Sequence, residues 1–359
     1  MPPSDLRSTV GRLLFVGIPG PELDDDARRA LVELQAGGVT LFRRNVGAPA
    51  AVAALCDALH ALPSQPLIAI DQEGGRVLRL GEPFTRFPPA AAIGQIGDAA
   101  FAYEVGRAIG EELASIGVDL NFAPVLDVHS NPDNPVIGDR SFGADPALVT
   151  EMALATMRGL RDAGIIPCGK HFPGHGDTAQ DSHVALPVVR RSRAEMERVE
   201  LPPFRAAIAA GVPMLLTAHV IYPALDPDHP ATLSHRIVSD VLRDELKFDG
   251  VIATDDLEMR AILDHHGIGE AAVAALRAGV DVVLICEDLA RARAARDAIV
   301  AAVESGTLDG RAVAAAAARV ARLRNAAARQ RRTACELPNR AHRALLDRLH
   351  TATPSVHSV

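Results

Sequence analysis

Eight short apolar runs recur along the chain, and stretches with helical periodicity separate them. Residues 101–115 are typical of these stretches, because Val105, Ile109 and Leu113 recur every fourth residue and charged residues occupy the other face. Strands that alternate with helices form a parallel sheet, and a sheet of eight such strands usually closes into a barrel. We therefore predict an α/β protein with a (β/α)8 barrel of the TIM type. The predicted strands are residues 13–17, 39–42, 67–71, 118–128, 165–171, 214–220, 251–255 and 282–286.

A glycine-containing phrase precedes five of these runs, which indicates that one supersecondary unit is repeated. The phrases AGGVT, ASIGVDL, DAGIIP, AAGVPM and RAGVDVV each place glycine where a left-handed residue would end a helix. An open doubly wound sheet that binds a nucleotide is the competing fold. No G-x-G-x-x-G or G-x-x-x-x-G-K-[ST] phrase follows any of the runs, which argues against that fold.

No change of composition or linker interrupts the pattern before about residue 325, so we predict a single domain. Residues 1–330 are assigned to the barrel, and residues 331–359 to an extension that is partly helical and then a loose tail. The first residues resemble neither a signal peptide nor a membrane span. The four cysteines lack paired spacing, so we expect a reducing cytoplasm and no disulfides. A monomer is the expected state.

Composition excludes several classes of ligand. The net charge of −8 argues against a basic surface for nucleic acid. The chain has no Trp, two Tyr and ten Phe. It therefore lacks the aromatic rings on which single-stranded nucleic acid stacks, and the rings that line a long polysaccharide cleft. If a sugar binds here, hydrogen bonds must hold it.

Polar side chains stand at the ends of most of the predicted strands. In a barrel the chemistry collects at the carboxyl ends of the strands, and so many ionisable groups would repel or desolvate one another if they only packed. We therefore predict a functional site at this end of the barrel. The residues concerned are Asp71, Asn121, Asp127, Lys170, His171, His219, Asp255, Asp256 and Glu287.

Some of these residues have a structural interpretation. Asn121 and Asp127 could satisfy backbone groups where the chain bends at Pro124. Glu287 and Asp288 could begin a helix, where acidic residues are favoured by the helix dipole. These alternatives stay open from the sequence alone.

The segment GKHFPGHGDTAQDSH raises the possibility of a metal-dependent hydrolase of the amidohydrolase type. Its potential metal ligands are His171, His175, Asp181 and His183. Such barrels usually carry H-x-H on the first strand, whereas this chain has LLFVG there. The glycines of the segment also predict a mobile loop, and metals prefer ligands on stiff strands. We therefore predict no metal.

Acid and base chemistry is the remaining interpretation of these residues. Asp181 lies two residues before His183, close enough for the carboxylate to hold the imidazole, fix its tautomer and raise its pKa. Asp255 or Asp256, at the end of a strand, could then act as a nucleophile. Spacing alone does not choose between these two aspartates.

Six motifs resemble those of glycoside hydrolase family 3, and within it the single-domain β-N-acetylhexosaminidases of the NagZ type. They occur in the family's order between about residues 12 and 290, and the K-H-F-P-G-H-G segment with its following D-S-H is the most specific. A C-terminal sandwich domain, found in many relatives, has no room here. The motifs are LIAIDQEGGRVLRL, NFAPVLDV, GDRSFGADP, GKHFPGHGDTAQDSHVALP, TAHVIYPALDP and TDDLEM.

The resemblance implies an exo-acting enzyme that retains the anomeric configuration and works through a covalent glycosyl-enzyme intermediate. It assigns the nucleophile to Asp255, the acid/base to His183, and the partner of that imidazole to Asp181. It implies no cofactor and no nucleic-acid or membrane partner. The positions that it implies for sugar binding are Asp71, Arg79, Arg140, Lys170 and His171.

The implied substrate is a small GlcNAc-containing saccharide, and by the resemblance a cytoplasmic muropeptide fragment of cell-wall recycling. Phosphorolysis at the same intermediate is the main alternative. A β-glucosidase or β-xylosidase specificity and a non-catalytic sugar-binding barrel are further alternatives. The D-S-H segment argues against the glucosidase and xylosidase specificities, and the complete set of Asp181, His183 and Asp255 argues against a non-catalytic barrel.

Overall fold

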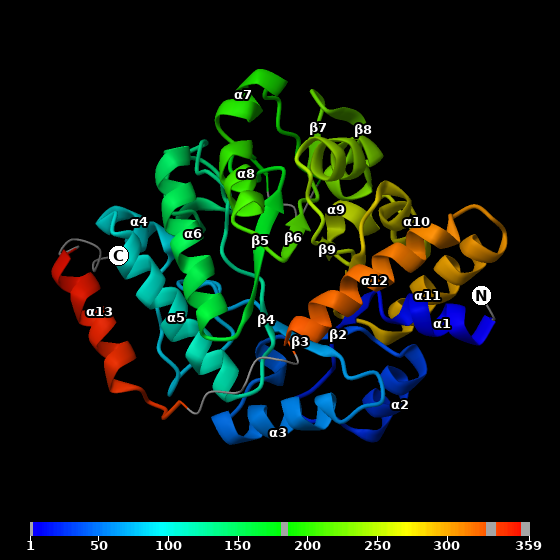
Figure 1. Cartoon of the computed structure of the whole chain (residues 1–359), viewed down its shortest axis with the longest axis horizontal. Coiled ribbons are helices and arrows are strands. Elements are labelled where there is room, and N and C mark those ends of the chain that lie inside the picture. Colours follow the sequence, from blue (N-terminus) through cyan, green and yellow to red (C-terminus); the bar gives the residue numbers. More distant parts are fainter. Residues whose placement is uncertain (1–2, 181–185, 328–334, 353–359) are drawn as a thin grey trace.

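Parallel strands close into a barrel in the computed structural model of the chain, which describes residues 3–180, 186–327 and 335–352 (Figure 1). Within these residues the strands follow one another around the barrel in the order β1, β10, β9, β6, β5, β4, β3, β2. Each of the eight apolar runs overlaps one of them, which confirms the predicted (β/α)8 architecture. The strands are β1 (Leu14–Val16), β2 (Gly38–Leu41), β3 (Leu67–Ile70), β4 (Leu120–Asn121), β5 (Ile166–Phe172), β6 (Met214–Thr217), β9 (Val251–Asp256) and β10 (Val282–Ile285).

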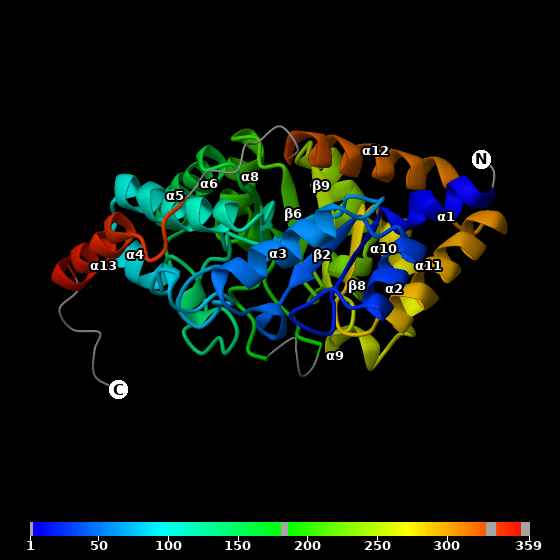
Figure 2. The same ribbon diagram turned by 90° about the horizontal axis from the view of Figure 1, so that it is seen from below.

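Helices surround the barrel, as the two perpendicular views show (Figures 1 and 2). The first half of the chain contributes α1 (Pro3–Gly11), α2 (Asp25–Leu34), α3 (Pro49–His60), α4 (Ala90–Ile96), α5 (Ala99–Ser115) and α6 (Pro146–Asp162). The second half contributes α7 (Arg193–Arg198), α8 (Leu201–Ala209), α9 (Arg260–Leu263), α10 (Ile268–Ala278), α11 (Leu289–Glu304), α12 (Gly310–Ala327) and α13 (Arg340–Ala352). Short helices lie at η1 (Arg43–Asn45), η2 (Gly138–Arg140) and η3 (Ala231–Leu233). None of the described helices is long and apolar enough to cross a membrane.

The helix α5 illustrates how local sequence sets an element. Asp98 precedes it, and its side chain accepts a hydrogen bond of 2.8 Å from the backbone N–H of Ala100, which caps the helix. Val105, Ile109 and Leu113 form a buried face, as their spacing predicted. The helix therefore turns its apolar side toward the core.

The glycine prediction is confirmed in four of its five phrases. In these four phrases Gly117, Gly164, Gly211 and Gly279 follow a helix and have a left-handed φ. It is wrong for AGGVT, because Gln35 takes the left-handed conformation that ends α2, with φ of 52°. Gly37 and Gly38 are needed for space instead. A Cβ on Gly38 would lie 2.6 Å from the ring of Phe15.

A buried carboxylate ties the outer helices to the amino ends of the strands. Asp281, just before β10, accepts a hydrogen bond of 2.9 Å from the N–H of Ile252. Arg319 of α12 lies 2.8 Å from the other carboxylate oxygen of Asp281, Oδ1. Arg243 also pairs with Asp281, at Oδ2. Because Asp281 is fully buried, these cations keep it satisfied, and the cluster lies away from the site described below.

The connection between β6 and β9 departs from a simple barrel unit. It contains an antiparallel hairpin of β7 (Ile221–Tyr222) and β8 (Asp226–Pro230), followed by the π-helix η4 (Arg236–Glu245). The sequence did not predict either element. The expected strand at residues 118–128 is also shorter, since ladder pairing in β4 ends at Asn121 and only an isolated bridge joins Val125 to Lys170.

The last helix, α13, lies in the predicted C-terminal extension and packs against α4 and α5, far from α12 (Figure 1). His342 contacts two carboxylates of α5, with Nδ1 2.9 Å from Glu112 and Nε2 3.0 Å from Glu111. Glu112 in turn accepts hydrogen bonds from the N–H and the hydroxyl of Thr85, at 2.9 and 2.6 Å. Glu112 of α5 thus links the helix α13 to the segment that follows β3.

Candidate active site

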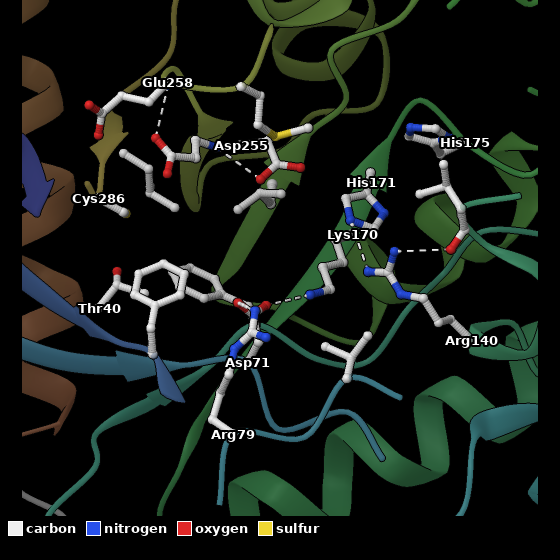
Figure 3. A pocket seen from close by; sticks show the side chains of 18 of the residues that line it. Thr40, Asp71, Arg79, Arg140, Lys170, His171, His175, Asp255, Glu258 and Cys286 are labelled. Atoms are coloured by element: carbon white, nitrogen blue, oxygen red, sulfur yellow. Dashed lines mark hydrogen bonds and ion pairs between the residues drawn. The ribbon is translucent and has the colours of Figure 1, made fainter. Parts of the chain in front are cut away.

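A pocket of about 510 Å³ opens at the carboxyl ends of the barrel strands (Figure 3). Six of the eight residues assigned by sequence line it, namely Asp71, Arg79, Arg140, Lys170, His171 and Asp255. The other two, Asp181 and His183, lie outside the described residues. The structure therefore brings together the sugar-binding set and the nucleophile position that the motifs implied.

The strand β5 delivers two consecutive side chains to this pocket. Side chains normally alternate between the two faces of a strand, so Lys170 and His171 should point in opposite directions. The register between β5 and β6 shifts between Lys170 and Phe172, as at a β-bulge. Both Lys170 and His171 consequently line the pocket (Figure 3).

Lys170 is the buried centre of an ionic cluster. Its ammonium lies 2.7 Å from Asp71 Oδ1 and 2.5 Å from Glu73 Oε1, and its side chain is only 3% exposed. Arg79 holds the second oxygen of Asp71 at 3.1 Å. Burial alone would raise the pKa of Asp71, but Lys170 and Arg79 outweigh it and hold that pKa below its usual range. Asp71 is therefore an ionised acceptor at the pocket floor.

Glu73 is a site residue that the sequence reasoning missed. The guanidinium of Arg140 grips it with two hydrogen bonds, of 2.9 Å from Nε and 2.8 Å from Nη2. Despite burial, Arg140 and Lys170 hold the pKa of Glu73 far below its usual range. The spacing was the available signal, because Asp71 and Glu73 are two residues apart and Asp71 follows a strand directly.

Asn121 satisfies backbone groups, which confirms the structural interpretation of this residue. Its amide accepts from the N–H of Gln72 and donates to the carbonyl of Gln72, each at 2.9 Å. Gln72 in turn accepts from the N–H groups of Arg79 and Leu80 at 2.9 and 3.1 Å. These bonds hold the end of β3 and the segment that carries Arg79 in one position.

Asp127 also satisfies backbone groups, as the structural interpretation predicted. It accepts from the N–H groups of His171 and His175, at 3.1 and 2.7 Å. In addition it lies 2.7 Å from Nδ1 of His171. Burial would raise the pKa of Asp127, but His171 and these hydrogen bonds keep it lowered. The residue therefore contacts a pocket side chain directly.

Asp255 and Asp256 stand next to each other at the end of β9. Asp255 accepts a hydrogen bond of 2.9 Å from the N–H of Asp256, and Asp256 accepts one of 3.0 Å from the N–H of Glu258. Burial raises the pKa of Asp256 to about 7, and the nearby carboxylates of Glu258 and Asp255 add to the effect. Asp256 is therefore held in surroundings that disfavour its charge.

Glu258 lines the pocket and is another residue that the sequence did not reveal. It joins the loop after β9 to the loop after β10, since it accepts from the N–H of Glu287 at 2.5 Å and pairs with Arg291 at 3.1 Å. Asp288 caps α11 by accepting from Ala290 N–H at 2.7 Å, which confirms its interpretation as the start of a helix.

His219, at the end of β6, contacts the backbone of Asp256 at the end of β9. Its Nε2 lies 2.9 Å from the carbonyl oxygen of Asp256, and its Nδ1 lies 2.8 Å from the hydroxyl of Thr232. The imidazole therefore bridges two backbone segments and does not appear among the residues that line the pocket.

The segment after β5 is packed tightly over residues 174–178, so the expectation of a mobile loop is wrong for these residues. A Cβ on Gly176 would lie 1.6 Å from the carbonyl oxygen of Val128. The hydroxyl of the buried Thr178 lies 3.1 Å from Asn134 Nδ2 and 2.9 Å from His175 Nδ1. The glycines permit close contact with the body of the barrel.

The metal interpretation has limited support in the described part of the chain. No group of three or more His, Cys, Asp or Glu side chains there could hold a metal ion. His171 Nδ1 bonds to Asp127, and burial lowers the pKa of His175 to about 4. The other two candidate ligands, Asp181 and His183, lie outside the described residues, so the absence of a metal stays a prediction.

Comparison with known proteins identifies the same family as the motifs. Residues 5–323 match the family described as "Glycosyl hydrolase family 3 N terminal domain". A "Beta-hexosaminidase" of Thiobacillus denitrificans is 45% identical over 280 residues, which cover 76% of this chain and 77% of that protein.

Solved structures of similar proteins indicate the same family. A glycoside hydrolase family 3 β-N-acetylglucosaminidase from Paenibacillus sp. FPU-7 superposes with a TM-score of 0.93 at 43% identity, covering 97% of this chain and 68% of that one. NagZ from Neisseria gonorrhoeae, in complex with N-trifluoroacetyl-D-glucosamine, gives a TM-score of 0.74 at 35% identity over 87% of this chain and 97% of that one. With its closed barrel and polar pocket, the chain belongs to glycosyl hydrolase family 3.

Proposed function

We propose that this glycoside hydrolase is an exo-acting, retaining β-N-acetylglucosaminidase that removes one terminal GlcNAc residue. The observation that carries the proposal is the pocket itself. Its volume of about 510 Å³ is that of a small-molecule site, and Asp255 lines it together with the ionic cluster of Asp71, Lys170 and Arg140. The β-hexosaminidase names of the relatives and the sugar derivative in the Neisseria gonorrhoeae structure support the same assignment.

Hydrogen bonds, not stacking, hold the sugar in this proposal. Asp71 offers carboxylate oxygens as acceptors, and Arg79, Lys170 and Arg140 offer N–H donors around it. Five Arg or Lys and five Asp or Glu side chains line the described pocket, so it has little excess formal charge and suits a neutral ligand with several hydroxyl groups. The absence of Trp from the sequence agrees with a short site for one sugar unit.

The chemistry proceeds in two displacements at the anomeric carbon. A carboxylate oxygen of Asp255 forms a bond to C1 while the bond from C1 to the leaving oxygen breaks, and His183 gives that oxygen its proton. In the second step His183 takes a proton from water, the water oxygen bonds to C1, and the carboxylate of Asp255 leaves. Asp181 holds the imidazole throughout.

The roles of His183 and Asp181 rest on the motif that contains them, because both lie outside the described residues. The described residues on the two sides of that segment are joined to each other by ion pairs. Arg191 pairs with Asp177 at 3.0 Å and with the buried Glu200 at 3.2 Å, which joins the chain before the segment to the chain after it.

Hydrolysis is preferred to phosphorolysis for an electrostatic reason. A phosphate acceptor needs cations that are available to it, whereas each cation that lines the described pocket is paired with a carboxylate. Arg79, Lys170 and Arg140 pair with Asp71 or Glu73. Arg76 pairs with Asp139 and Arg260 with Asp264. We further propose a muropeptide fragment of cell-wall recycling as the natural substrate, a cytoplasmic location and a monomeric state, which follow from the family resemblance.

A panel of aryl β-glycosides carrying GlcNAc, GalNAc, glucose or xylose tests the proposal. We expect the highest kcat/KM for GlcNAc, and free GlcNAc as the product both with and without added phosphate. A fluorinated GlcNAc donor should label the protein, and peptide mapping should locate the sugar on Asp255. Appearance of GlcNAc 1-phosphate would establish phosphorolysis, and a label on Asp256 would show that the wrong aspartate was chosen.

A further inference from the structure

The neighbours of the buried Asp127 carboxylate require both of its oxygens to accept hydrogen bonds. It has no exposed surface, and one oxygen, Oδ1, accepts from the backbone N–H groups of His171 and His175 at 3.1 and 2.7 Å. Peptide N–H groups can only donate, so Oδ1 must accept. A buried charge is costly unless every oxygen is satisfied, and the second oxygen, Oδ2, meets Nδ1 of His171 at 2.7 Å. Nδ1 therefore carries a proton.

The opposite side of the His171 ring faces a donor that cannot change its role. Nη2 of Arg140 lies 3.5 Å from Nε2 of His171, and the two hydrogen bonds to Glu73 fix the guanidinium in place. Arginine has no acceptor atom, so a second N–H on the ring would point at another N–H and at a positive charge. The ring is therefore in the neutral tautomer with its lone pair on Nε2.

We propose that Asp127 is a positioning residue that locks His171 in the Nδ1–H tautomer, so that the pocket recognises a hydroxyl group of the sugar that donates to Nε2. This inference rests on the proposed function, because it requires a sugar in the pocket. It assigns to Asp127 a task beyond satisfying the backbone.

The lock has a consequence for specificity. A hydroxyl group can donate to Nε2 of His171 and accept at the same time from Arg140, whereas a fluorine at that position could only accept. Replacing that hydroxyl would leave Nε2 of the buried ring with only the long 3.5 Å contact to Arg140 as a donor. Loss of such a bond in a desolvated site corresponds to about a 10- to 100-fold weaker binding.

The variant Asp127→Asn tests the lock. Its amide oxygen can still accept the two backbone N–H bonds, which places the amide NH2 against Nδ1 of His171. The ring must then accept at Nδ1 and carry its proton on Nε2, facing Arg140. We expect ¹H–¹⁵N spectra of histidine-labelled protein to show a protonated Nδ1 for His171 in the parent and a protonated Nε2 in the variant. The His171→Gln variant identifies the signal.

Binding supplies the second readout, with GlcNAc and its 3-, 4- and 6-deoxyfluoro analogues as probes. The parent should bind one of these analogues about 10-fold or more weakly than GlcNAc. In Asp127→Asn, GlcNAc itself should bind about 10- to 100-fold more weakly, and the discrimination against that analogue should shrink, because Nε2–H can donate to fluorine.

Asp119→Asn is the matched control. Asp119 likewise accepts from a backbone N–H, that of Ile68 at 2.8 Å, and contacts a histidine, His60, at 2.8 Å, but at the other end of the strands. This variant should leave the tautomer of His171 and the binding of GlcNAc unchanged.

The inference is overturned if His171 carries its proton on Nε2 in the parent, a measurement that does not depend on folding of the variant. It is equally overturned if the tautomer changes in Asp127→Asn while the four affinities stay as in the parent. Failure of the proposed function would look different, because the parent itself would then neither bind GlcNAc nor cleave its aryl glycosides.

Discussion

Replacing Asp256 by Asn should stabilise the protein above neutral pH, because this carboxyl group is held in an environment that disfavours its charge. Burial, with Glu258 and Asp255 close by, raises the pKa of Asp256 from 3.8 to about 7. The amide of Asn can keep the hydrogen bond from the N–H of Glu258, and it carries no charge. The substitution therefore removes an electrostatic cost while keeping the local turn.

The magnitude follows from the pKa difference between the folded and unfolded states. Below pH 3.8 both states are protonated and the group has no effect on stability. Between pH 3.8 and about 7 only the unfolded state ionises, so the parent loses up to about 1.4 kcal/mol of stability per pH unit. Above pH 7 the loss levels off at no more than about 4 kcal/mol, and about half that if solvent in the pocket screens the charge.

Urea unfolding of parent and variant at pH 5, 6, 7 and 8 measures this difference. The advantage of Asp256→Asn should grow from pH 5 to pH 7 and then stay constant. The exposed Asp133 offers a control, since Asp133→Asn should differ from the parent by less than about 0.5 kcal/mol at every pH. A difference for Asp256→Asn that does not change with pH, or a variant less stable than the parent at pH 8, would refute the reasoning.

Three further substitutions test the site and the barrel. Asp255→Ala should lower turnover of an aryl GlcNAc glycoside by about 1,000-fold or more with an unchanged unfolding midpoint, and retained activity would contradict its role as nucleophile. Gly176→Ala places a Cβ 1.6 Å from the carbonyl oxygen of Val128 and should cost about 1 to 3 kcal/mol of unfolding free energy, whereas Gly20→Ala, with open space around it, should cost little. Asp281→Ala leaves two arginines without their buried partner and should cost about 3 to 5 kcal/mol in urea unfolding; a smaller loss would mean that water replaces the carboxylate.

The barrel could be predicted because its strands are buried on both faces. Such strands are continuous apolar runs, and the turn residues between them mark the repeats. The hairpin of β7 and β8 was missed because residues 226–230, DPDHP, have the composition of a loop. Its pairing depends on contacts such as the hydrogen bond from Ser234 to Asp226, which local periodicity does not contain.

The candidate site was predictable where a polar residue directly follows an apolar run, as Asp71 and Lys170 do. Glu73 and Glu258 follow their strands by a few residues. The two-residue spacing from Asp71 is the only local signal for Glu73, and nothing local distinguishes Glu258 from a loop carboxylate. The role of Glu73 depends on its hydrogen bonds with Arg140, which lies 67 residues further along the chain. Glycine is ambiguous in the same way, because Gly176 signals close packing here and a flexible chain elsewhere.

The attachment of α13 also bears on the order in which the protein is completed during synthesis. Its His342 contacts Glu112, and Glu112 holds Thr85 in the segment between Arg79 and α4. A ribosome makes α13 after every strand of the barrel, so a nascent chain can close its barrel before this support exists. The segment after β3 that carries Arg79 therefore gains this support, which reaches it through Glu112, only after every strand of the barrel has been made.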